Sequence, residues 1–171
     1  ASSSASLTQT GIDSTYATYA IILEDFHPSA DGGTLQLRLG DSSGIDETSG
    51  DYDFMVANGL VNTADSYAHN TRGYSMDHAD NAIKVVNGDV GAGTGEGFSV
   101  VAYLHNARGS SVYPIVTGRG YKIDRYNSDG ADIEFWGHRT SMITTDRVMV
   151  QFEGSTTIVT GRMTVWGISH A

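Results

Sequence analysis

Short apolar runs of four to eight residues recur along the whole chain. Each run has the length of a β-strand and is too short for an ordinary helix. Together they predict roughly nine or ten strands. The clearest runs cover residues 19–26, 35–39, 52–56, 82–86, 98–105, 112–116, 133–136, 148–152 and 162–168.

The order of apolar and polar residues within a run predicts which faces are buried. In the run 35–39, leucines alternate with Gln36 and Arg38, as a half-buried antiparallel strand requires, and 148–152 repeats this pattern. The runs 19–23 and 100–104 are apolar on both faces. We therefore expect these two to be central strands, or to lie under a second layer such as a neighbouring subunit.

Glycine-containing turns separate the runs, because glycine adopts left-handed backbone conformations at little cost. Only 62–72 hints at a helical turn, and the chain shows no linker or compositional break. We expect one domain over residues 1–171, an all-β antiparallel two-sheet sandwich of jelly-roll type. The turn sequences are Asp31-Gly32-Gly33, Asn87-Gly88-Asp89, Asp129-Gly130 and Glu153-Gly154-Ser155.

Charge and composition exclude several classes of function. The chain has 20 acidic and 10 basic residues, a formal net charge of −10, and no basic stripe, so nucleic acid is not an expected partner. No apolar run approaches the ~20 residues of a membrane span. The Ser-rich start lacks the basic and apolar regions of a secretory signal. With no cysteine, disulfides, thiolate nucleophiles and thiolate metal sites are excluded.

No catalytic motif emerges. The chain has no Gly-x-Ser-x-Gly elbow, and Ser99 continues into a strand run. The stretch 91–97 is rich in glycine, but Glu96 replaces the last glycine of a dinucleotide fingerprint and no Lys-Ser/Thr follows, so we interpret it as a surface loop. Acid pairs for sugar hydrolysis have only unspecific candidates. These are Glu24, Glu96, Glu134 and Glu153.

Metal binding has two weak candidates. His78 clusters with Asp77 and Asp80, nine residues after His69, but zinc-ligand spacing is absent. Two acidic loops offer the oxygen ligands that calcium prefers, although the spacing of the second fails the EF-hand pattern, because Asp129 stands where the loop glycine belongs. Their members are Asp41, Asp46, Glu47, Asp51 and Asp53 in one loop, and Asn127, Asp129 and Asp132 in the other. We expect no catalytic, cofactor-binding or metal residues, and keep a structural calcium as an alternative.

Nine tyrosines, two tryptophans and five phenylalanines are more aromatic residues than one small core readily absorbs. Exposed tyrosines stack on sugar rings or anchor protein interfaces, whereas others close strand ends with their hydroxyls in water. The tyrosines beside polar, Gly-rich segments are Tyr52, Tyr67, Tyr74, Tyr113 and Tyr126.

Several stretches together resemble small phage virion proteins of the tail-fibre or capsid-decoration type. These stretches are the Ser-rich start 1–7, the GIDSTY turn with Tyr19, the His27-Pro28-Ser29-Ala30-Asp31 turn, 94–99, 103–106 and the closing strand 161–168. The resemblance implies a non-enzymatic structural protein on the particle exterior, and it supplies no catalytic residues. His27 replaces a basic residue of that pattern, and 62–80 does not align with it.

This resemblance and the composition lead to one expectation of function. We expect a virion component, in capsid decoration or a tail fibre, that acts through self-assembly and surface binding to other virion proteins and to host glycans. A homotrimer is the assembly that we expect. The alternative is a carbohydrate-binding module of jelly-roll type that uses loop tyrosines or calcium.

Overall fold

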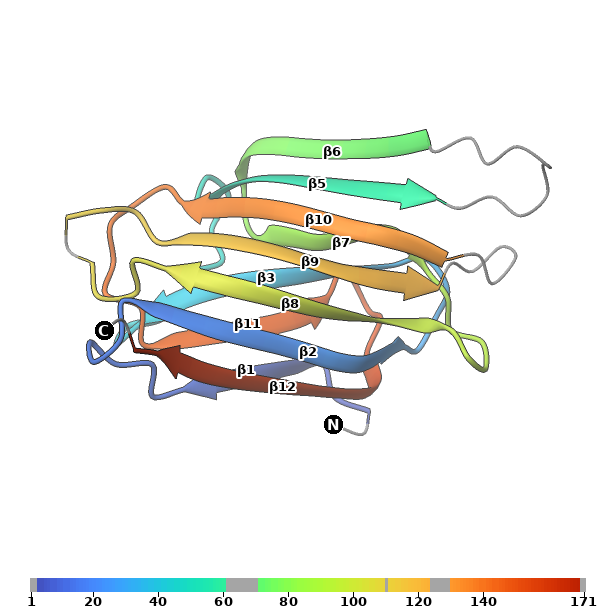
Figure 1. Cartoon of the computed structure of the whole chain (residues 1–171), viewed down its shortest axis with the longest axis horizontal. Helices are drawn as coiled ribbons and strands as arrows, with labels where there is room; N and C mark the ends of the chain where they lie inside the picture. Colours follow the sequence, from blue (N-terminus) through green and yellow to red (C-terminus); the bar gives the residue numbers. More distant parts are fainter. Residues whose placement is uncertain (1–2, 61–70, 110, 124–129, 170–171) are drawn as a thin grey trace.

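Strands with alternating inward and outward side chains build two antiparallel sheets that pack face to face (Figure 1). The structure is a computed structural model that describes residues 3–60, 71–109, 111–123 and 130–169. Within these ranges no helix is long and apolar enough to cross a membrane. The predicted all-β antiparallel two-sheet sandwich is confirmed. The strands are β1 (Ser6–Thr10), β2 (Thr18–Pro28), β3 (Gly33–Asp41), β4 (Gly44–Ile45), β5 (Tyr52–Leu60), β6 (Thr71–Asp80), β7 (Ile83–Val90), β8 (Gly97–His105), β9 (Ile115–Ile123), β10 (Gly130–Arg139), β11 (Arg147–Phe152) and β12 (Ile158–Ile168).

The two sheets differ in size and in the order of their strands. The larger sheet has the order β12-β2-β8-β9-β10-β5-β6, and the smaller has β1-β11-β3-β4 with β7 also beside β3. Strands β8, β9 and β10 follow one another in sequence and in space, which makes a meander at the middle of the larger sheet (Figure 1). This meander positions the site described below.

The core lies between the sheets. Ile21, Leu23 and Leu104 from the larger sheet are fully buried, as are Leu37 and Val150 from the smaller one. Burying such a side chain contributes about 1.5–3 kcal/mol. The alternation predicted for 148–152 is therefore confirmed, because Val148, Val150 and Phe152 all face this core.

One expectation about alternation is wrong. Gln36 and Arg38 were expected on a solvated face, yet they are only 4% and 5% exposed. Arg38 donates to the Asn81 carbonyl (2.8 Å) and to the Gln36 amide oxygen (3.2 Å). Strand β3 is therefore covered on both faces. The hydrogen bonds compensate for burying these polar side chains on the face that points away from the core.

Strand β9 was placed too early in the sequence. The predicted run 112–116 overlaps it only at the end, because β9 spans Ile115–Ile123 and contains Gly118 and Gly120. A Cβ at Gly118 would lie 2.3 Å from the Phe135 ring, and one at Gly120 would lie 2.2 Å from the Ser99 carbonyl oxygen. Glycine here makes room for neighbouring strands instead of marking a turn.

Three strands were not predicted, and two other expectations need revision. Strands β1, β4 and β6 were missed. The predicted turn around Gly88 lies inside β7, where Gly88 has a positive φ of 60° in an irregular pairing with β3. The helical turn expected at 62–72 falls mostly outside the described residues, and its last two residues belong to β6.

Candidate functional site

The outward-facing side chains of the seven-stranded sheet form a continuous surface, which we call the open face. Eight of the twelve large apolar side chains that are exposed in the described ranges lie on it. An exposed apolar surface of this extent marks an interaction site in soluble proteins. The eight are Tyr74, Met76, Val101, Tyr103, Ile115, Tyr121, Trp136 and Trp166.

Strand register aligns many of these side chains in one row across all seven strands. Directly opposite residues of antiparallel strands share a face and lie within side-chain contact of one another. The row passes from Trp166 on β12 to Met76 on β6 without a gap in register. We call it the aromatic row. It consists of Trp166, Ala20, Tyr103, Thr117, Trp136, Met55 and Met76.

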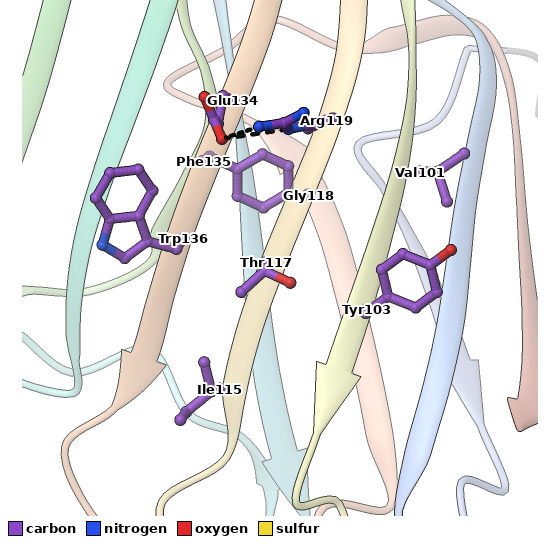
Figure 2. A pocket seen from close by; sticks show the side chains of 9 residues that line it. All are labelled: Val101, Tyr103, Ile115, Thr117, Gly118, Arg119, Glu134, Phe135 and Trp136. Carbon is purple, nitrogen blue, oxygen red and sulfur yellow. Dashed lines mark hydrogen bonds and ion pairs between the residues drawn. The ribbon is translucent and has the colours of Figure 1, made fainter. Parts of the chain in front are cut away.

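A groove of about 780 Å³ runs along β9 at the centre of this row. Figure 2 shows Tyr103 and Val101 on one side, Trp136 on the other, and the small Thr117 side chain between them. The two aromatic rings are carried by strands β8 and β10, on either side of β9. The groove thus has aromatic walls and is open to solvent.

Charged side chains close one end of the groove in pairs. Arg119 donates two hydrogen bonds to one oxygen of Glu134, the shorter of 2.6 Å (Figure 2). Further along the face, Arg162 pairs with Glu24, also at 2.6 Å. Both pairs join neighbouring strands on the exposed surface, so each adds little stability and mainly balances charge.

Two further grooves flank the central one and share its walls. One, of about 480 Å³, lies beyond Trp136 and is lined by Met55 and Met76. The other, of about 580 Å³, lies beyond Val101 and Arg119. The three grooves make the open face a ridged surface on which aromatic and apolar ridges alternate with hollows.

Asp53 lies between two histidines at the rim of the open face. Its carboxylate is 2.7 Å from the His78 ring and 3.7 Å from the His138 ring, and it accepts a hydrogen bond from the Ala79 amide. Burial acts to raise the pKa of Asp53, but the Ala79 amide and the His78 ring outweigh it and hold this pKa below its usual value.

The outer face of the smaller sheet is chemically different. Its outward positions on β1, β11 and β3 are polar apart from one methionine. The contrast follows from the sequence, since the same alternation places hydroxyls and amides outward here and aromatic rings outward on β8, β9 and β10. These positions are Ser6, Thr8, Met149 and Gln151, together with Gln36 and Arg38 on β3, which are buried.

Two carboxylates of the first acidic loop form ion pairs with an arginine. The nearly buried Arg139 donates to Asp46 (2.9 Å), and its other guanidinium nitrogen lies 3.2 Å from Asp51. Burial would lower the pKa of Arg139, but these carboxylates raise it. Asp41 accepts from the Ser43 amide, while Asp53 faces the histidines, so the loop does not converge on one point.

The remaining metal candidates that the structure describes do not converge either. In the described ranges, no group of three or more histidines and carboxylates is placed to hold a metal ion. Asp132 faces outward on β10, and His78 contacts Asp53 across the strands. His69, Asn127 and Asp129 lie outside the described residues.

The glutamates considered for hydrolysis are engaged elsewhere or lie in turns. Glu24 and Glu134 each accept hydrogen bonds from an arginine, and Glu153 is exposed in a turn. Glu96 accepts from the Gly93 amide within the glycine-rich loop, and Asp31 accepts from the Ala92 amide of the same loop. Residues 91–96 therefore form a connection between β7 and β8, and Gly97, the last residue of the predicted loop, begins β8.

Tyrosines fall into two environments. Tyr52 is fully buried, and burial raises the pKa of its hydroxyl, whereas Tyr74 and Tyr113 are exposed. Tyr67 and Tyr126 lie outside the described residues. Sequence reasoning missed the ring that matters most for the groove, Trp136. The sequence does contain a signal for Trp136: it occupies an outward position of a strand whose inward positions, Ile133 and Phe135, are also apolar.

Comparison with protein-family models finds no match, and comparison with curated proteins finds no similar sequence. The interpretation of the open face therefore relies on its geometry and chemistry.

Proposed function

We propose that this chain is a non-enzymatic structural component of a phage particle's exterior, which assembles through the open face of its larger sheet. One observation supports this most strongly. Tryptophan, tyrosine or methionine occupies five of the seven positions in a row that crosses one outer face in register, whereas the outward positions of β1 and β11 on the other sheet are polar apart from one methionine. Aromatic residues, methionine and arginine are the types enriched at protein interfaces.

Two features of the sequence support the placement on a particle. The turns and strand ends at 11–19, 27–31 and 161–168 resemble those of small phage virion proteins. The formal net charge of −10 gives the chain no electrostatic reason to lie against packaged DNA. An exterior position is consistent with both.

Light scattering on the purified protein tests self-assembly. The expected result is a mass above that of one 18.2 kDa chain, unchanged by a calcium chelator. A single-chain mass at every concentration would contradict assembly through the open face. Dissociation by the chelator would instead favour the calcium alternative.

Immunogold labelling tests the placement. An antibody against the chain is expected to label intact phage particles on their outer surface. Labelling that appears only after the particles are disrupted would contradict an exterior position.

Glycan binding is the second candidate, and the central groove favours it. Tyr103 and Trp136 flank a polar end formed by Arg119 and Glu134, and sugars combine an apolar ring face with hydroxyls. Titration with neutral oligosaccharides, followed by isothermal titration calorimetry, tests this function. Binding lost in Trp136→Ala but kept in Trp166→Ala, which lies outside the groove, would support it.

A further inference from the structure

We infer that the open face is occupied by the open face of a second copy of this chain, packed sheet against sheet about a two-fold axis. This inference rests on the proposed function and specifies its partner. A surface that contacts its own counterpart makes an isologous interface, which closes at two copies. The trimer expected from the sequence would need a different contact.

The size of the face suits a stable dimer. Neighbouring strands lie about 4.8 Å apart, and residues on one face recur every ~6.8 Å along a strand. Seven strands in register over four rows therefore give a flat area of roughly 30 Å by 20 Å per copy. A ridged surface exposes more than its flat area, so the face approaches the ~800 Å² per partner of a standard interface.

The relief of the face suits packing against itself. Tyr103 and Trp136 form ridges on either side of the groove above Thr117. Two sheets that pack face to face at an aligned angle interdigitate such side chains about 10 Å apart. A two-fold axis that lies in the plane of the contact, between the groove and the Trp136 ridge, places the Trp136 ridge of each copy over the groove of the other.

Charge on the open face permits the contact despite the acidic chain. Two copies with a formal net charge of −10 repel each other, and repulsion favours approach through the surface where charge is most balanced. On the open face Arg119 pairs with Glu134 and Arg162 pairs with Glu24, while Asp132 adds an exposed carboxylate on β10. Asp53 lies between two histidines at the rim. Because these arginines and glutamates already pair within one copy, the apolar side chains around them are free to contact the other copy.

The cysteine-free chain allows a direct test with single introduced cysteines. Thr117 lies on β9, the middle strand of the seven, in the aromatic row. Because the two-fold axis lies between β9 and β10, beside Thr117, the two Thr117 positions lie near each other across the contact. The matched control is Thr8, an exposed threonine on β1 in the outer face of the smaller sheet. Both variants are treated with a short thiol-to-thiol cross-linker, after circular dichroism has confirmed their β-structure.

The expected result is a covalent dimer that forms at least tenfold faster in Thr117→Cys than in Thr8→Cys, together with a solution mass of two chains. A two-chain mass with equal or faster cross-linking of Thr8→Cys would overturn the inference, while self-assembly itself would stand. A three-chain mass would overturn the two-fold axis in the same way. A single-chain mass for the unmodified protein at all concentrations would contradict the proposed function as well.

Discussion

At the scale of single residues, the surroundings of a side chain depend on contacts that the local sequence does not contain. Tyr52 follows a polar, acidic loop, and this context favours an exposed ring. In the fold its hydroxyl is buried, accepts a hydrogen bond from the Leu39 amide and contacts the carbonyls of Leu39 and Asp46. These partners come from β3 and from the loop before β5, so only the folded chain brings them together.

Removing this hydroxyl leaves buried backbone groups without their partner. We expect Tyr52→Phe to lower the free energy of unfolding by about 1–3 kcal/mol. Tyr74→Phe is the matched control, because Tyr74 is exposed, and it should change stability by less than about 0.5 kcal/mol. Urea unfolding of the three proteins measures both values. Equal stability of Tyr52→Phe and the parent protein would contradict the structural role of the buried hydroxyl.

Asp53 makes stability depend on pH. Because its pKa is lower in the folded chain than in the unfolded one, its contribution is fully present above the ordinary value of about 3.9. That contribution is lost as the pH falls through the lower pKa of the folded state. We expect Asp53→Asn to be less stable than the parent at pH 7, with a gap that narrows below about pH 4.

Urea unfolding of both proteins at a series of pH values measures this gap. A gap that stays constant down to about pH 2.5 would show that the Asp53 carboxylate does not have the lowered pKa described above.

At the scale of elements, alternation in the sequence predicted the buried strands and missed those with little apolar content. All nine predicted runs overlap a strand. The missed strands are polar or very short: β1 offers only Leu7 to the core, and β6 is an edge strand with Asp77, His78 and Asp80. Such strands form because a neighbour supplies their hydrogen bonds, and a single run of sequence does not show its neighbours.

Gly118 illustrates the same limit and yields a prediction. Its place beside Phe135 and Ala102 is set by the register of three strands, so a sequence reader sees only a turn residue. We expect Gly118→Ala to cost about 1–3 kcal/mol, because the new methyl group overlaps the Phe135 ring. Thr117→Ala, the neighbour that faces outward, should cost less than about 1 kcal/mol. Thermal unfolding compares the two, and equal losses would contradict the inward direction of Gly118.

For the whole molecule, the sequence indicated that two apolar strands lie centrally or under a second layer. The runs 19–23 and 100–104 are apolar on both faces, and the structure places them side by side in the larger sheet, with Val101 and Tyr103 exposed. The aromatic row itself could not be predicted, since it depends on the register of seven strands. Trp136 belongs to the row only because it lies opposite Thr117 and Met55.

The most direct measurement of the central claim compares two exposed methionines by sedimentation equilibrium. Met76 (67% exposed) ends the aromatic row, whereas Met142 (52% exposed) lies between β10 and β11, away from the open face. We expect Met76→Asp to weaken self-association at least tenfold, about 1.4 kcal/mol, because it buries a charge in the contact. Met142→Asp should associate like the parent protein. Unchanged association of Met76→Asp, or equal weakening in both variants, would contradict assembly through the open face.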